Sequence, residues 1–372
     1  MAEPPFRADH VGSLLRPPEL LRAREQHRAG RLSAAELRRV EDAAIRDAAR
    51  FQAEIGLQGV TDGEYRRGSW HMDFLYRIGG VEKTDRVLHI QFKNDAGTLD
   101  FTPAAHRVAG KLTLNETIFG DDFAYLKSVA PPGTTPKLTI PSPSMLHYRG
   151  GRAAIDETAY PEMAAFWDDL ADVYAREIAG LHALGCTYLQ LDDTSLAYLN
   201  DPAQRAYVDS IGGDGESQHL TNIRLINRAL AGKPAGMTVC THMCRGNFRS
   251  SWMASGGYDH VAEALFGELA VDGFFLEYDD SRSGGFAPLR FVPKGPKKIV
   301  LGLVTTKTPA LESKDDLKRR IDEAAKYVAL DQLCLSPQCG FSSTVEGNAL
   351  TIDEEIAKLR LIVDTAREVW GD

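Results

Sequence analysis

The sequence lacks the features that would place the protein in a membrane or on a nucleic acid. No window approaches the roughly 18 to 20 consecutive apolar residues of a membrane span, and residues 1–9 carry no apolar core for a signal peptide. The 43 Lys and Arg residues are scattered rather than gathered into runs, and 52 Asp and Glu residues bring the formal net charge to −9. We therefore expect a cytoplasmic protein that binds neither membranes nor nucleic acids.

Cysteine is also scarce. The chain has five cysteines, an odd number in a long chain, which argues against a disulfide framework. Cys186, Cys240 and Cys334 stand inside apolar runs and are expected to be small core residues. Cys244 and Cys339 stand just after apolar runs, and for these two thiols we consider metal binding or catalysis instead.

The chain does contain clear helical patterns. Ser33 and Glu36 form a capping-box pattern, apolar residues recur at three- and four-residue steps over 37–55, and Gly56 ends the run. A second helix is expected to open near 158–161 and to stop near Gly185. Each helix is followed by a short apolar run, which is typical of alternating helices and strands.

Eight short apolar runs are predicted to be strands, at 7–11, 57–61, 137–140, 187–191, 237–241, 273–276, 299–304 and 332–335. Amphipathic helical patterns separate most of them. The alternation predicts an α/β fold, a parallel (β/α)8 TIM-type barrel formed by 1–372 as a single domain. A doubly wound sheet is the alternative. The segment 66–136 breaks the alternation and is predicted to be an insertion after the second strand, with a hairpin over the barrel mouth.

Four residues at three strand ends suggest a metal site. In such barrels the functional groups lie at the C-terminal ends of the strands. His242 and Cys244 follow the fifth strand, Glu277 the sixth and Cys339 the eighth, and together they offer one nitrogen, two sulfurs and one oxygen. Each is unremarkable alone, but the combination suits Zn²⁺, which accepts all three ligand types.

Other strand ends carry polar residues as well: Gly12 and Ser13, Asp62 and Glu64, Asp192 and Asp193, and Thr306 and Lys307. The acids among them either bind a substrate or cap the helices that follow. The residues alone leave both interpretations open.

Six motifs carry a family resemblance: Asp9-His-Val-Gly-Ser13, Thr61-Asp-Gly-Glu64, Leu189-Gln-Leu-Asp-Asp193, Thr241-His-Met-Cys244, Phe275-Leu-Glu277 and Ser336-Pro-Gln-Cys-Gly340. In these motifs, over almost the whole chain, the sequence resembles the cobalamin-independent methionine synthase family. The resemblance is to its C-terminal catalytic barrel and to the short standalone proteins built on that barrel.

The resemblance implies a methyltransferase that acts on the thiol of homocysteine or a similar thiol, with a zinc-activated thiolate as nucleophile. It implies His242, Cys244, Glu277 and Cys339 as the zinc ligands. The expected partners are a small thiol and a methyl donor, a methyl-folate in the family. A homodimer is left open.

The resemblance also implies how an amino-acid thiol would be held. Glu64 and Asp192, with Asp193 beside it, match the acids that bind the ammonium group. Gly12 and Ser13 match the turn that holds the carboxylate through N–H and O–H donors.

Departures from the family concern the methyl donor. The family's proton-donating histidine after strand seven is absent, since 304–308 reads Val-Thr-Thr-Lys-Thr. Tyr148 stands where the family has a tryptophan that stacks on folate. Candidate catalytic residues are therefore Lys307, Tyr148 and, within the first motif, His10. The N-terminal half of the long family members is missing, which argues against polyglutamyl-folate.

Two other functions compete. One is zinc-dependent thiol transfer to another electrophile, as in epoxide opening by coenzyme M, for which Arg16, Arg66, Arg67 and Lys307 could bind a sulfonate. The other is a non-catalytic barrel that binds zinc or a thiol. A metal-free decarboxylase on the same barrel is disfavoured by the four zinc-type ligands.

Overall fold

The computed structural model describes residues 3–87, 90–94, 97–101 and 104–371. Its centre is a seven-stranded sheet in the order β1-β6-β7-β8-β9-β10-β11, with every pair of neighbours parallel. The strands are β1 (Gly59–Val60), β6 (Thr135–Pro141), β7 (Tyr188–Asp193), β8 (Thr238–Met243), β9 (Gly273–Glu277), β10 (Lys298–Val304) and β11 (Leu333–Pro337). The prediction of a parallel α/β barrel-type fold is confirmed.

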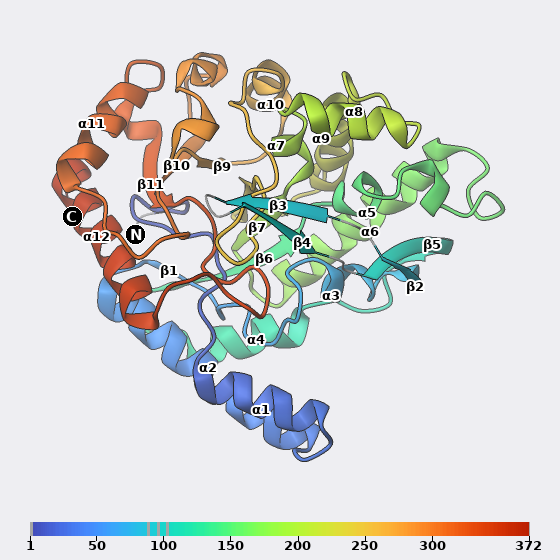
Figure 1. Cartoon of the computed structure of the whole chain (residues 1–372), viewed down its shortest axis with the longest axis horizontal. Helices are drawn as coiled ribbons and strands as arrows, with labels where there is room; N and C mark the ends of the chain where they lie inside the picture. Colours follow the sequence, from blue (N-terminus) through green and yellow to red (C-terminus); the bar gives the residue numbers. More distant parts are fainter. Residues whose placement is uncertain (1–2, 88–89, 95–96, 102–103, 372) are drawn as a thin grey trace.

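Helices alternate with these strands and surround the sheet (Figure 1). The longer ones are α1 (Pro18–Arg28), α2 (Ala34–Ile55), α4 (Gly120–Val129), α6 (Met163–Ala183), α8 (Pro202–Ser210), α9 (Gln218–Leu230), α10 (Ala262–Glu268), α11 (Lys314–Ala324) and α12 (Ile352–Trp370). Short turns of helix form α3 (Met72–Leu75), α5 (Met145–Tyr148) and α7 (Ser195–Tyr198), and 3₁₀ turns occupy Arg152–Ala154, Ser281–Ser283, Ala287–Phe291 and Leu330–Gln332.

The predicted helix signals are confirmed for α2 and shifted for α6. The Ser33 hydroxyl accepts a hydrogen bond from the backbone N–H of Glu36, and the Glu36 carboxylate accepts one from the Ser33 N–H, so the capping box forms. Gly56 ends α2 in the left-handed conformation at φ 106°. The α6 helix begins at Met163, later than the sequence pattern suggests. Among the described residues, the helices are either too short or too polar to cross a membrane.

The first predicted strand, 7–11, is reduced to a single β-bridge. Ala8 bridges Leu335 of β11, and the segment continues past the end of β1, where the Leu14 N–H bonds to the Gly63 carbonyl. The reason is local: Asp9 accepts hydrogen bonds from the backbone N–H groups of Phe6 and His10. Such side-chain bonds compete with a strand ladder. Residues 7–14 nevertheless lie between β11 and β1 and fill the gap in the ring.

Two core layers hold the fold together. One packs the outer face of the sheet against the helices. The other fills the sheet interior with Phe6, Val11, Tyr188, Cys240, Phe275, Val300 and Cys334. Cys186, Cys240 and Cys334 are fully buried, as predicted for core thiols.

Two antiparallel strand pairs stand between β1 and α4. One pairs β2 (Gly79–Val87) with β5 (Ala104–Thr113), and the other pairs β3 (Ile90–Asn94) with β4 (Gly97–Phe101). Figure 1 shows the β3–β4 hairpin across the middle of the barrel. Backbone hydrogen bonds in both directions between Lys93 and Trp252 fix it to the loop after β8. It therefore covers part of the barrel mouth.

Candidate metal centre

The four residues predicted as metal ligands converge at one edge of the sheet. His242 ends β8, Cys244 follows it, Glu277 ends β9, and Cys339 follows β11. All four are buried, and one nitrogen, oxygen or sulfur atom from each lies within 4.8 Å of the others. The two sulfur atoms are 3.5 Å apart. Parallel strands in a curled sheet place their C-terminal ends together, which explains how residues far apart in sequence meet.

Several polar atoms of this cluster have no partner among the described residues. Both ring nitrogens of His242 and Oε2 of Glu277 are buried without a hydrogen bond. Buried polar atoms are nearly always paired, so such atoms call for an explanation. A nitrogen, two sulfurs and an oxygen around one point form a ligand set that a zinc ion accepts. The residues present therefore fit such a cation.

The thiols of Cys244 and Cys339 form a hydrogen bond with each other. Their mutual contact, with help from His242, lowers the pKa of Cys339 well below its usual range, and the same contact raises the pKa of Cys244. Burial raises the pKa of the Glu277 carboxyl. Opposite shifts in two touching thiols mean that one of them readily loses its proton, as a metal-binding thiol must.

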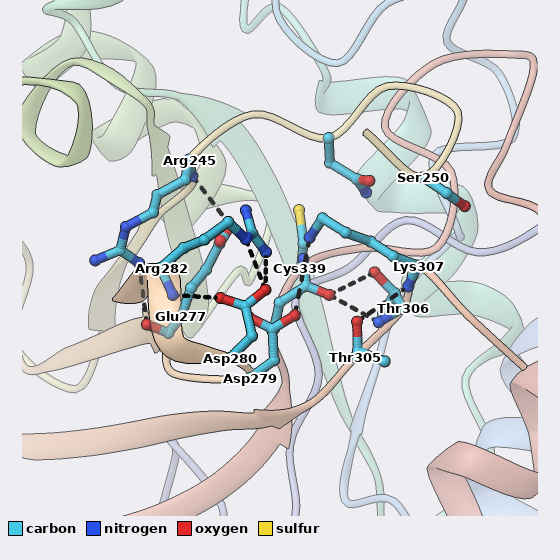
Figure 2. Close-up of polar contacts among 12 residues, drawn as sticks. Arg245, Ser250, Glu277, Asp279, Asp280, Arg282, Thr305, Thr306, Lys307 and Cys339 are labelled. Atoms are coloured by element: carbon cyan, nitrogen blue, oxygen red, sulfur yellow. Dashed lines mark hydrogen bonds and ion pairs between the residues drawn. The ribbon is translucent and has the colours of Figure 1, made fainter. Parts of the chain in front are cut away.

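Arg245, a residue that no sequence motif singled out, holds Glu277 in place. Its backbone N–H donates to Oε1 of Glu277 at 3.0 Å, and its guanidinium donates to the Glu277 carbonyl and to the Tyr258 hydroxyl, also at 3.0 Å. The Glu277 N–H in turn donates to the Tyr258 oxygen at 2.8 Å. Figure 2 shows Arg245 against Glu277. Its position directly after Cys244 is the only hint that the sequence offers.

Lys307 lies beside the cluster. Its side chain is buried and reaches toward Cys339 and Asp279 (Figure 2), with Nζ 4.0 Å from Oδ2 of Asp279. No hydrogen-bond acceptor among the described residues contacts this amine. Its charge lowers the pKa values of both Glu277 and Cys339, although larger causes act on each.

A cavity of about 320 Å³ opens on the cluster and brings in three predicted substrate residues: Ser13, Glu64 and Asp192. Strand register pairs Asp192 of β7 with His242 of β8, so this acid lies next to a predicted ligand. Burial raises the pKa of Asp192 to about 7 and also raises the pKa of Glu64. Arg67 already forms a buried ion pair with Oε1 of Glu64 at 3.6 Å, and the second acid, Asp192, adds negative charge that favours a cationic ligand.

Local packing fixes the anchors. The Thr139 hydroxyl donates to Oε1 of Glu64 at 2.8 Å, while Oε2 of Glu64 is buried without a partner among the described residues. Gly12 lies behind this wall at φ 146°, and a Cβ there would lie 2.6 Å from the Thr139 methyl carbon. Gly340 packs directly on the Ser13 hydroxyl. The close contacts explain both glycines.

The predicted site residues that do not line this cavity include Asp193, Tyr148, His10 and Lys307. The Asp193 carboxylate accepts hydrogen bonds from the hydroxyls of Ser144 and Ser195 and from the Leu196 N–H, which is the helix-capping alternative. Tyr148 donates to Gln204 and lines a separate cavity of about 210 Å³.

His10 is buried near Lys137, and burial lowers its pKa to about 4.

The rest of the cavity has an aromatic part that was not anticipated. Its lining includes Phe92 and Phe101 of the β3–β4 hairpin, Phe248 of the loop after β8, and Tyr198 of α7. These residues come from loops and an insertion, where no regular period marks a side chain as site-facing. The sequence predicted a hairpin over the barrel mouth, but not which of its side chains line the cavity.

Comparisons with known proteins show what the chain is similar to. Residues 141–368 match the family model described as "Cobalamin-independent synthase, Catalytic domain". The chain is 48% identical to the uncharacterized protein YxjH of Bacillus subtilis over 98% of this chain and 95% of that protein. It is 24% identical to the methionine synthase of Pyrococcus abyssi over 95% of this chain and 88% of that protein.

Solved structures with the same fold include two relatives. A candidate vitamin-B12-independent methionine synthase from Listeria monocytogenes has a TM-score of 0.79 and 40% identity, covering 99% of each chain. A B12-independent methionine synthase from Shewanella sp. W3-18-1, in complex with selenomethionine, has a TM-score of 0.71 and 18% identity, covering 98% of this chain and 97% of that one.

Proposed function

We propose that this chain, which belongs to the cobalamin-independent methionine synthase family, methylates the thiol of homocysteine or a closely similar thiol at a zinc centre. The family makes the chain an enzyme of the methyltransferase type. The observation that carries the zinc proposal is the buried cluster of four ligand-type atoms within 4.8 Å. The cavity beside it supplies the substrate site.

His242, Cys244, Glu277 and Cys339 would hold the zinc. Zinc bound there would keep a substrate thiol in its thiolate form at neutral pH, where it is a nucleophile. The methyl carbon then forms a bond to sulfur while its bond to the donor breaks, and the bonding electron pair leaves with the donor. The unpartnered atoms of His242 and Glu277 support this assignment, because a cation would satisfy them.

Two neighbouring cations would balance the charge of the centre. Two thiolates and one carboxylate around a divalent ion leave one net negative charge. The Arg245 guanidinium contacts Glu277, and the Lys307 amine lies at the same cluster. Among the catalytic candidates from the sequence, Lys307 is the one beside the cluster, which supports it as the proton donor to the departing group.

Glu64 and Asp192 would bind the ammonium group of the thiol substrate. Both carboxylates line the cavity, and Asp192 lies beside His242. Ser13, on the same cavity wall, would donate its hydroxyl to the substrate carboxylate. This arrangement places one anion-binding and one cation-binding group beside a thiol-activating centre, which is what an amino-acid thiol requires.

The acids also weigh against coenzyme M. A sulfonate in the part of the cavity next to His242 would face Glu64 and Asp192, and like charges repel in a buried site. Arg66 pairs with Asp42 and Asp122, so it is not free to bind a sulfonate. Homocysteine therefore remains the better acceptor.

Proton release on binding tests the proposal. Zinc-loaded protein is titrated with homocysteine at pH 7 by calorimetry in buffers of different ionisation enthalpy. A free thiol has a pKa of about 8.5, so binding as thiolate should release roughly one proton. Homoserine, which carries a hydroxyl in place of the thiol, should release none. Equal binding of both compounds, or no proton release, would contradict the proposal and favour a non-catalytic barrel.

A further inference from the structure

The cavity beside the metal centre has two electrically different regions. Its buried acids, Glu64 and Asp192, belong to the region next to His242. The remaining carboxylate of the lining, Glu346, is exposed. Elsewhere the lining carries Lys83, Arg149 and apolar side chains. The acidic region suits an ammonium group, and the other region offers no such acid.

An aromatic roof, which we define as Phe92, Phe101 and Phe248, covers the second region. Phe248 packs on Phe101 with ring centroids 4.5 Å apart and on Phe92 at 5.4 Å. The roof is held down by the backbone pair of Lys93 with Trp252. Aromatic faces of this kind suit an apolar or planar part of a ligand.

Arg149 stands in this region without a carboxylate partner. Its guanidinium lies over the rings of Tyr148, Tyr198 and Tyr207, at 4.9, 5.2 and 5.6 Å from their centroids. Its polar contact is a bond from Nη2 to the sulfur of Met253 at 2.8 Å. Over the described part of the chain, no Asp or Glu oxygen forms an ion pair with it.

A guanidinium has five N–H donors, and a thioether is a weak acceptor. The aromatic rings position the group but cannot satisfy these donors. Carboxylates and other oxyanions match the planar fork of arginine with two parallel hydrogen bonds. A half-buried Arg149 that lines a ligand cavity is therefore poised for an anion.

Two histidines line this wall without adding charge to it, because burial lowers the pKa of each. His71 and His106 both line the cavity. Burial, with the charges of His106 and Arg149, lowers the pKa of His71 to about 3. A neutral His71 leaves the positive charge on Arg149, and no acid in the wall competes with an incoming anion.

Gly246 connects this wall to the metal centre. Its N–H donates to the Cys244 sulfur at 3.3 Å. A Cβ at Gly246 would lie 2.9 Å from the Tyr198 hydroxyl and 3.0 Å from the Phe92 ring. The same Cβ would lie 2.9 Å from Cβ of Met253, the residue that Arg149 contacts. A ligand under the roof is thus within one residue's width of the Cys244 sulfur.

We propose that Arg149 is a specificity-determining residue that binds an anionic group, of the carboxylate class, on the methyl donor while the aromatic roof covers the donor's apolar part. The inference rests on the proposed function in so far as the bound molecule is a methyl donor. The anion site itself does not require the metal. Homocysteine would occupy the acidic region, so the two substrates meet at Cys244 from opposite sides.

A matched pair of probes tests the anion site on the full chain. The probes are 4-methoxybenzoate and 4-methoxybenzamide, which share shape and aromatic ring and differ in charge. Binding is measured by calorimetry on the wild type, on Arg149→Gln and on Arg152→Gln, a control whose arginine lines the separate cavity. A charged hydrogen bond contributes about 1.5 to 3 kcal/mol, so the benzoate should bind at least about tenfold more tightly than the amide.

The outcomes separate clearly. Loss of this preference in Arg149→Gln, its retention in Arg152→Gln, and unchanged homocysteine affinity in both would support the inference. Equal binding of the two probes, or a preference that survives Arg149→Gln, would overturn it. A fall in homocysteine affinity would assign Arg149 to the amino-acid substrate instead. Arg149→Met, which removes the charge and keeps an unbranched side chain, repeats the test if the glutamine variant does not fold. A protein without zinc or homocysteine binding would refute the proposed function and still give a readable probe result.

Discussion

The sulfur atoms of Cys244 and Cys339 lie 3.5 Å apart, although 95 residues separate them in the chain. Two ligands at roughly 2.3 Å from one tetrahedral ion are roughly 3.8 Å apart, so the separation is close to that of two thiolates on one zinc. The strand ends of β8 and β11 bring them together. The first prediction below follows from this relationship.

Substitution of Cys339 should remove the metal and leave the fold intact. In Cys339→Ser we expect zinc affinity to fall by more than about 100-fold. Removing only a residue that supports a ligand costs up to about 100-fold, and this substitution removes the ligand itself. Methyl transfer should disappear. Metal analysis after dialysis and the melting temperature give both readouts, because the barrel core lies outside the cluster.

The control is Cys186→Ser, at a fully buried thiol whose contact is with the Tyr188 carbonyl. It should keep stoichiometric zinc. Stoichiometric zinc in Cys339→Ser as well would show that the ligand assignment is wrong.

Asp192→Asn should keep zinc and bind homocysteine about 10- to 100-fold more weakly, because a charged hydrogen bond to the ammonium group is lost. The compound 4-mercaptobutyrate has the same thiol and carboxylate but no ammonium group, and it should bind the variant and the wild type alike. Calorimetry on both compounds makes the comparison. A similar loss for both compounds would remove the ammonium role from Asp192.

Gly246→Ala should disturb the region between the metal centre and the roof. Gly246 has φ 91°, and an added methyl group would meet Tyr198, Phe92 and Met253 within about 3 Å. A positive φ with such contacts costs about 1 to 3 kcal/mol of unfolding free energy, measurable by urea denaturation. Gly267→Ala, in α10 with nothing within 4 Å of the new carbon, is the control and should not destabilise the protein. Equal stability of the two variants would mean that the space around Gly246 is not filled as described.

Glu177 predicts a pH dependence of stability. It is fully buried, both its oxygens accept from the Ile118 N–H, and burial raises its pKa to about 7. Between the unfolded value of about 4.3 and about 7, the folded state keeps a proton that the unfolded state releases, so stability falls as pH rises through this window. Glu177→Gln cannot ionise and should be more stable than the wild type at pH 8, on the order of 1 to 3 kcal/mol. Chemical denaturation at pH 4 and pH 8 should show the difference growing with pH; a constant difference would contradict this.

Strand ends were the part of the site that the sequence predicted well. Apolar runs fix where β8, β9 and β11 stop, and a parallel sheet fixes that these ends meet, so His242, Glu277 and Cys339 could be grouped without a structure. The first predicted strand was reduced because one polar side chain, Asp9, bonds the local backbone instead.

The roof and its arginine could not be predicted in the same way. Phe92 and Phe101 reach the cavity because the β3–β4 hairpin docks on a distant loop. Arg149 is a candidate anion-binding residue because no carboxylate among the described residues pairs with it. Periodicity reports which face of an element is buried, but it carries no information on such long-range docking.

Zinc X-ray absorption of the purified protein, with and without homocysteine, tests the central claim most directly. The account predicts two sulfur neighbours at roughly 2.3 Å in the free protein, from Cys244 and Cys339, and three once homocysteine is added. Zinc that gains no sulfur from homocysteine, or a protein that binds no zinc, would contradict it.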